Sequence, residues 1–141
     1  MTRPPPSRRP SACSRTSNRR YGTSGTIADL LIDTDVFVDH LRGARELRAG
    51  SDSLCYSTVT RCELFAGSGD EEEPVRRLLA PLRELPVDRP VAELGGRIRR
   101  ETRVRTPDAL IAATALVHRL TLVTRNRRDF EPVAGLSLRA P

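Results

Sequence analysis

Four acidic residues each stand where a regular element is expected to meet a turn: Asp33, Glu63, Asp108 and Asp129. Carboxylates gathered in one cleft repel one another unless a cation lies between them. Oxygen-loving divalent metals such as Mg²⁺ suit such a set, and they activate water for hydrolysis. The four acids therefore predict a hydrolytic metal site, provided that the fold brings them together.

Strands and helices are expected to alternate from residue 27 onward. Short apolar runs predict strands at 27–33, 54–56, 85–87, 121–124 and 136–138. Apolar residues at helical spacing predict helices at 35–41, 58–66, 70–82, 91–101 and 107–119, the last with Thr106 as its N-cap. This alternation favours an α/β fold with a parallel sheet covered on both faces. Sites in such sheets lie beyond the carboxyl ends of the strands, where Asp33 and Asp129 are expected.

Each acid also has a simpler explanation when it is taken alone. Asp33 is placed to cap the helix that follows it. Glu63 stands at a capping-box interval from Thr60. Asp108 suits the positive end of a helix dipole, and Asp129 belongs to a polar turn that is typical of a solvated loop. Only the coincidence of all four favours a metal site.

The net charge of +6 comes from the N-terminal segment, because residues 1–26 hold six arginines and no acid. This segment is rich in Pro, Arg and Ser and has almost no apolar residues, so we expect a disordered extension or an over-extended start. It has no apolar core of a secretory signal, and no run in the chain is long enough to cross a membrane. Three cysteines without metal-finger spacing favour reduced thiols in a cytoplasmic protein.

Four segments, in their order along the chain, resemble the PIN-domain ribonucleases, and specifically the VapC toxins of bacterial toxin–antitoxin pairs. The segments are D-T-x-V-x-x-x-x-L within 31–41, T-x-x-E-L-x-x-G within 58–67, D-A-L-I-A-A-T-A-L within 107–116 and T-L-V-T-R-N-x-R-D-F at 121–130. The resemblance implies a three-layer α/β/α PIN domain over residues 27–141. It also implies a Mg²⁺- or Mn²⁺-dependent endoribonuclease that acts as a toxin.

The same resemblance assigns the metal ligands. The three metal-binding acids of the family correspond to Asp33, Glu63 and Asp108. The fourth is assigned to Asp129, because Asn126 stands where many members carry an acid.

The resemblance also implies how the substrate and the partners are bound. Contacts to an RNA substrate are expected at Thr34, Thr124, Arg125 and Asn126. Thr34 and Thr124 are similar to the hydroxyl residues that flank the site in the family. Apart from the resemblance, Arg125, Arg127 and Arg128 flank the site and are placed to grip the RNA backbone, although each alone also suits a solvated loop. The implied partners are a cognate VapB-type antitoxin and a second copy of the chain in a homodimer.

One departure from the family keeps alternatives open. The connection over residues 101–106 is shorter than in most members. A catalytically impaired PIN module, which binds RNA or an antitoxin without cleaving, is therefore the first alternative. A DNA nuclease of the same architecture is the second. A small phosphate-binding α/β protein is disfavoured, because no glycine-rich loop follows a predicted strand.

Overall fold

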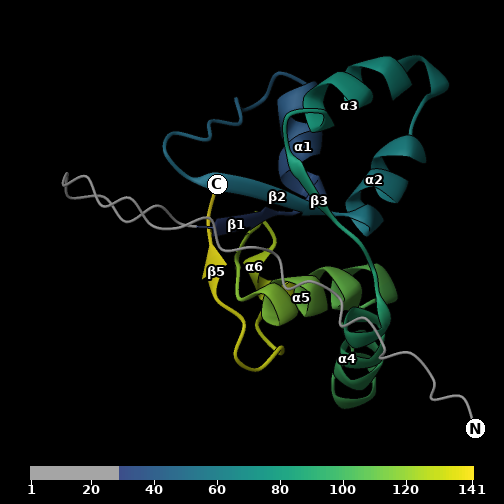
Figure 1. Ribbon diagram of the computed structural model, residues 1–141, viewed down its shortest axis with the longest axis vertical. Coiled ribbons are helices and arrows are strands. Elements are labelled where there is room, and N and C mark those ends of the chain that lie inside the picture. The colour runs from purple at the N-terminus through teal and green to yellow at the C-terminus, as the bar shows by residue number, and fades with distance from the viewer. Residues whose placement is uncertain (1–28) are drawn as a thin grey trace, which may run out of the picture.

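The computed structural model describes residues 29–141, so the extension expected at residues 1–26 lies outside the described part of the chain. The centre of the domain is a five-stranded sheet in which all paired strands are parallel (Figure 1). Its strands are β1 (Asp29–Ile32), β2 (Ser53–Ser57), β3 (Arg83–Leu85), β4 (Thr121–Val123) and β5 (Leu138–Arg139). They stand in the order β3-β2-β1-β4-β5.

Helices cover both faces of the sheet. They are α1 (Thr34–Leu41), α2 (Thr58–Phe65), α3 (Glu72–Leu79), α4 (Arg89–Glu101), α5 (Thr106–His118) and the one-turn α6 (Arg127–Phe130), with a 3₁₀ turn η1 (Gly69–Glu71) before α3. Figure 1 shows α1, α2 and α3 on one side of the sheet and α4 and α5 on the other. The three-layer α/β/α fold is therefore confirmed. No helix within residues 29–141 is long and apolar enough to cross a membrane.

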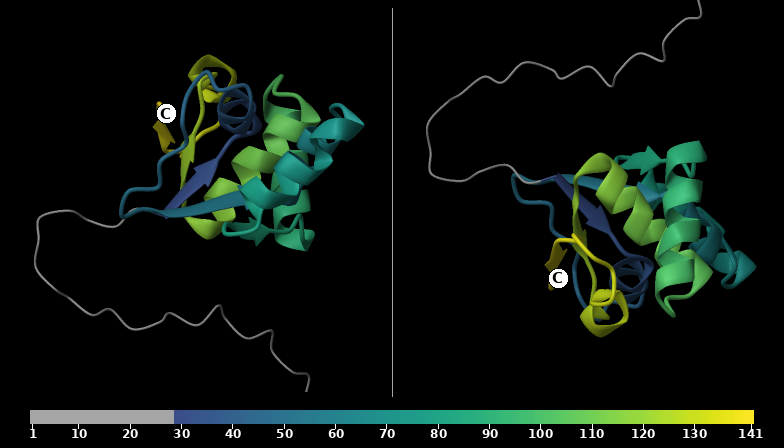
Figure 2. Two further views of the ribbon diagram at one scale, coloured as in Figure 1. Left: turned by 90° about the horizontal axis from the view of Figure 1, so that it is seen from above. Right: turned by 90° about the horizontal axis from the view of Figure 1, so that it is seen from below.

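Two apolar clusters, one on each face, hold the layers together. Leu30 and Ile32 of β1 pack with residues of α1, α2 and α3, while Leu31 points to the opposite face and packs with α4 and α5. Figure 2 shows α4 and α5 lying side by side. Their close approach depends on Gly95, where a Cβ atom would come within 2.8 Å of the Leu110 side chain.

The order of the strands creates a switch point between β1 and β4. From β1 the chain moves to β2 and β3 on one side, and it later returns through β4 and β5 on the other. Leu31 is consequently in register with Cys55 of β2 and with Leu122 of β4. A crevice forms beyond the carboxyl ends of strands at such a point. Asp33 and Thr124 are the first residues after these two strand ends.

Several local expectations differ from the structure. The last strand is at Leu138–Arg139 rather than 136–138, and the helix expected at 70–82 is the 3₁₀ turn η1 followed by α3, which ends at Leu79. The third strand is at Arg83–Leu85 rather than 85–87, because Pro86 has no N–H to continue the ladder. The helix expected to be capped by Thr106 begins at that residue, and Arg105 takes the N-cap position. Finally, the segment expected as a turn after β4 contains α6, whose single turn is too short to show a helical period in the sequence.

Candidate active site

Asp33 lies at the carboxyl end of β1, where it caps α1. Its Oδ1 accepts a hydrogen bond from Thr34 N at 2.8 Å, and its Oδ2 accepts one from Thr124 Oγ1 at 2.8 Å. Asp33 is only 6% exposed. The pKa of Asp33 is raised from 3.8 to about 7, first by burial and then by the charges of Asp35 and Asp108, against the two hydrogen bonds, which lower it. Asp33 therefore does cap α1, but its carboxylate is also buried in the crevice, where the charged form is disfavoured.

Asp35 is a second carboxylate of α1 that is held against the end of β4. Its Oδ2 accepts a hydrogen bond from Arg125 N at 3.0 Å, and Thr124 Oγ1 lies 3.4 Å from the same oxygen. Its Oδ1 is buried and has no hydrogen-bond partner among residues 29–141. Burial raises the pKa of Asp35 above its usual value. A buried carboxylate oxygen in this state is costly unless a cation or another partner reaches it.

Glu63 reaches the site from the second turn of α2. Its Oε2 accepts a hydrogen bond from Thr34 Oγ1 at 2.5 Å. The residue that caps α2 is Ser57, whose Oγ accepts from Val59 N at 3.1 Å. The capping-box explanation of Glu63 is therefore wrong, because its carboxylate bonds across the fold to α1.

Asp108 occupies the first turn of α5, near the positive end of that helix. Its Oδ2 lies 3.3 Å from Arg105 Nε in an ion pair. Its charge acts on Asp33 and raises the pKa of that residue. The short 101–106 connection thus leaves Asp108 close enough to Asp33 for the two carboxylates to interact.

The segment that follows β4 completes the site. Asn126 N donates to Thr124 Oγ1 at 3.0 Å, which turns the chain toward α6 and the exposed Asp129. Arg125 folds back over α1, where its Nη1 donates to Asp39 Oδ1 at 2.8 Å. This segment therefore brings an acid, an amide and a guanidinium to the acids of β1 and α1.

Acids from the end of β1 and from α1, α2, α5 and α6 meet at one open cavity of about 240 Å³. Its polar lining comprises Asp33, Thr34, Asp35, Glu63, Arg105, Asp108, Arg125, Asn126 and Asp129. The four acids that the sequence predicts to converge therefore line the same cavity, and it lies at the switch point of the sheet.

The donor set of this cavity suits a hydrated divalent cation. A cation would compensate the buried charge of Asp33 and the unpartnered Oδ1 of Asp35. Within residues 29–141, no three Asp, Glu, His or Cys side chains form a ready-made metal cage. Mg²⁺ does not need one, since it keeps several waters and is commonly bound by one or two carboxylates. The open arrangement of acids therefore fits Mg²⁺ better than a fully dehydrated ion.

The four residues expected to contact a substrate divide into two pairs. Thr124 is fully buried and its hydroxyl is engaged by Asp33, so the expectation of a substrate contact there is corrected to a role in holding that acid. Thr34 is half-buried, and its hydroxyl is similarly engaged by Glu63. Arg125 and Asn126 are exposed at the cavity and remain available to a substrate.

Sequence reasoning missed two residues that bind members of this site. Asp39 lies four residues after Asp35, so both fall on one face of α1, and this spacing is a signal in the sequence. Arg105 lies three residues before Asp108, at the start of α5, where a long side chain can turn back to the first helical turn. Neither residue is a fixed position of the family motifs, so the motifs alone do not identify them.

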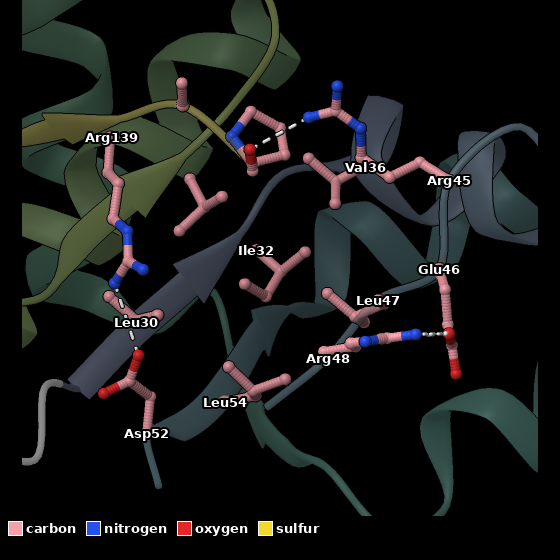
Figure 3. Close-up of a pocket in the computed structure, with 13 residues that line it drawn as sticks. Leu30, Ile32, Val36, Arg45, Glu46, Leu47, Arg48, Asp52, Leu54 and Arg139 are labelled. Carbon is pink, nitrogen blue, oxygen red and sulfur yellow. Dashed lines mark hydrogen bonds and ion pairs between the residues drawn. The ribbon is translucent and has the colours of Figure 1, made fainter. Parts of the chain in front are cut away.

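A second cavity, of about 160 Å³, lies on the α1 side of the sheet (Figure 3). Its floor is apolar and consists of Leu30, Ile32, Val36, Leu47, Leu54 and Val123. The arginines at its rim all have partners. Arg45 donates a hydrogen bond to the carbonyl of Pro141, while Arg48 and Arg139 form ion pairs with Glu46 and Asp52. It shares no lining residue with the acidic cavity, so the predicted chemistry belongs to the acidic one.

The fold and the acids at its switch point define the class of this protein. Residues 30–136 match the PIN domain family, and the chain belongs to that family. Two relatives are Ribonuclease VapC19 and Ribonuclease VapC10 of Mycobacterium tuberculosis. VapC19 is 34% identical over 113 residues, which cover 71% of this chain and 90% of that protein. VapC10 is 39% identical over 109 residues, which cover 69% and 82%.

Solved structures agree with this assignment. A toxin–antitoxin complex from Klebsiella pneumoniae contains a chain with a TM-score of 0.66 and 32% identity, and the match covers 76% of this chain and 94% of that one. DNA-bound VapBC from Salmonella typhimurium gives a TM-score of 0.70 and 26% identity, covering 81% and 98%. The predicted resemblance to VapC proteins is therefore confirmed.

Proposed function

We propose that this protein is a Mg²⁺- or Mn²⁺-dependent endoribonuclease and the toxin of a toxin–antitoxin pair. The observation that carries the proposal is the gathering of Asp33, Glu63, Asp108 and Asp129 around one cavity at the switch point. Relatives that are named ribonucleases, and a similar structure described as a toxin–antitoxin complex, support it.

In this proposal the four acids hold the metal through their carboxylate oxygens. When bound, the ion supplies a Lewis acid that polarises a phosphodiester and makes water a better nucleophile. The chain itself orients the ligands: Thr34 N and Thr124 Oγ1 hold the two oxygens of Asp33, and Thr34 Oγ1 holds Glu63. Hydrogen bonds of this kind favour the ionised carboxylate, which is the form that binds a cation.

Arg125 and Asn126 are the proposed substrate contacts inside the acidic cavity. The guanidinium of Arg125 is oriented by Asp39, so only part of its hydrogen-bonding capacity is used. A guanidinium presents a planar fork of donors that matches a phosphate group. Asn126, whose backbone is held by Thr124, offers a side-chain amide beside the same cavity.

The proposed partners are a VapB-type antitoxin and a second copy of the chain. The VapBC structure from Salmonella typhimurium supports the antitoxin by its similarity to this chain. The homodimer and the cytoplasmic location stay predictions from the family resemblance. Sedimentation of the purified protein, alone and with the product of a neighbouring short gene, would test both partners.

The decisive experiment measures cleavage of matched single-stranded RNA and DNA. Wild-type protein is assayed with Mg²⁺, with Mn²⁺ and with EDTA, beside Asp33→Asn and Asp108→Asn. Asp70→Asn is the matched control, because Asp70 is an exposed acid of η1 outside the cavity. We expect metal-dependent cleavage of RNA that both site variants lose and the control retains.

Other outcomes decide among the alternatives. Cleavage that survives both site substitutions would contradict the assignment of Asp33 and Asp108 as metal ligands. Preferential cleavage of DNA would indicate the DNA nuclease. Binding of RNA or antitoxin by a wild-type protein that cleaves neither nucleic acid with either metal would indicate the catalytically impaired module.

A further inference from the structure

The connection between α4 and α5 is firmly built. Thr102 Oγ1 donates to Ile98 O at 2.7 Å and accepts from Val104 N at 3.2 Å. Arg99 Nη1 donates to Val104 O at 2.8 Å, and the Val104 side chain is buried in the core. The short segment that departs from the family pattern is therefore anchored at its middle residue.

This anchoring determines where the neighbouring arginines lie. Arg103 and Arg105 flank the buried Val104 and are both exposed. Both line a cavity of about 350 Å³ together with Asp108, Arg128 and Asp129. That cavity adjoins the acidic cavity, because Arg105, Asp108 and Asp129 line both.

The arginines of this adjoining cavity are largely unused by the protein. Arg105 makes one ion pair, with Asp108, and its side chain is still 79% exposed. Arg103 and Arg128 form no ion pair with any acid of residues 29–141. By contrast, Arg61, Arg76 and Arg77 are each paired with a glutamate. Exposed guanidinium groups with one acidic partner or none, gathered beside the proposed hydrolytic centre, are suited to bind phosphate groups.

We infer that Arg103, Arg105 and Arg128 bind the phosphate backbone of the RNA strand on the α5 side of the scissile bond. This inference rests on the proposed function and adds a direction to it. The strand would extend from the acidic cavity, where Arg125 and Asn126 lie, into the adjoining cavity toward the α4–α5 connection. The short connection over residues 101–106, which suggested impaired catalysis, would then help to bind the substrate.

The test compares wild-type protein with Arg103→Gln, Arg128→Gln and the double variant. Arg97→Gln is the matched control, because Arg97 is an exposed residue of α4 that lines none of the cavities around the acids. Binding of a labelled single-stranded RNA is measured in EDTA at several salt concentrations. Cleavage is measured separately with Mg²⁺. The arginines of residues 1–26 add the same background to every variant, so differences report the cavity alone.

We expect each single variant to weaken RNA binding about three- to tenfold, and the double variant more. The plot of log K against log salt has a negative slope, and each lost phosphate contact should make it less steep by about 0.7. In cleavage, KM should rise more than kcat falls, and Arg97→Gln should match wild type. Melting temperatures within a few degrees of wild type would exclude unfolding as the cause.

Two results would overturn the inference. The first is a folded double variant that binds RNA with the wild-type affinity and salt slope. The second is a double variant that loses binding to polyglutamate but not to RNA, which would indicate an acidic protein partner instead. A wild-type protein that fails to cleave RNA, yet binds it in an arginine-dependent way, refutes the proposed function and supports the inference. The two claims therefore fail separately.

Discussion

Thr124 Oγ1 donates a hydrogen bond to Asp33 Oδ2 at 2.8 Å and so joins two residues that are 91 positions apart. Both are buried, and they follow neighbouring parallel strands at the switch point of the sheet. The hydroxyl also accepts from Asn126 N. One side chain thus orients the most buried acid of the site and the backbone of the segment that leads to Asp129.

Replacing Thr124 by Val should impair both stability and activity, whereas Thr124→Ser should preserve most of each. Valine leaves one oxygen of a buried carboxylate without its donor, which costs about 1–3 kcal/mol. It also removes a hydrogen bond that lowers the pKa of Asp33. We expect RNA cleavage to fall at least tenfold, measured beside urea denaturation. A Thr124→Val variant that keeps stability and activity while Thr124→Ser loses them would show that methyl packing, not the hydroxyl, matters.

The metal-free protein should lose stability as the pH rises from about 4 to about 7. The pKa of Asp33 is about 7 in the folded chain against 3.8 for the free group. In this range the folded state keeps a proton that the unfolded state has released, so the stability contributed by Asp33 is full below about pH 4 and is lost as the pH rises through about 7. The difference between the two values corresponds to roughly 4 kcal/mol.

Urea denaturation in EDTA between pH 4.5 and pH 8 would measure this effect. Asp33→Asn should remove most of it and should be more stable than wild type at pH 8. Glu84 contributes with the opposite sign, because hydrogen bonds from Tyr56 and Arg61 lower its pKa. The difference between wild type and Asp33→Asn is therefore the quantity to compare. A pH-independent difference would contradict the prediction.

Mg²⁺ or Mn²⁺ should raise the melting temperature at neutral pH, and EDTA should reverse the rise. A ligand that binds only the folded state at a hundred times its Kd adds about 2.7 kcal/mol of stability. Asp33→Asn and Asp108→Asn should lose most of this response, while Asp70→Asn should keep it. Differential scanning fluorimetry across a metal titration provides the measurement. An unchanged response in both site variants would place the cation elsewhere.

Two adjacent glycines of α4 should respond in opposite ways to alanine. Gly96 is exposed, and a Cβ atom there would meet nothing within 4 Å, so Gly96→Ala should stabilise the helix by about 0.5–1 kcal/mol. At Gly95 a Cβ atom would come within 2.8 Å of Leu110, and overpacking costs about 1–3 kcal/mol. Thermal melts of the two variants test the packing of α4 on α5, and a higher melting temperature for Gly95→Ala would contradict it.

The layers of the fold and the gathering of the acids could be predicted from the sequence, because each rests on a local pattern. Apolar runs identify the parallel strands, and the order of the four acidic motifs places Asp33, Glu63 and Asp108 on their elements. These motifs locate the site because Asp33 directly follows a strand, and Glu63 and Asp108 lie in the first two turns of their helices.

Contacts made across the fold could not be predicted in this way. Asp39 looks like an ordinary surface acid of α1 until Arg125, 86 positions later in the chain, reaches it. Thr124 resembles a hydroxyl available to a substrate until its neighbours bury it completely. The single turn of α6 has too few residues to show a period. In each case the missing information is tertiary.

The position of β4 also has a consequence for the order of events during synthesis. Thr124 is translated 91 positions after Asp33, and β4 must pair with β1 before Asp33 acquires this partner. A nascent chain therefore cannot assemble the acidic cavity until the residues through Asp129 have emerged. The contact between Thr124 and Asp33 therefore makes assembly of this cavity a late event of folding, which follows the pairing of β4 with β1.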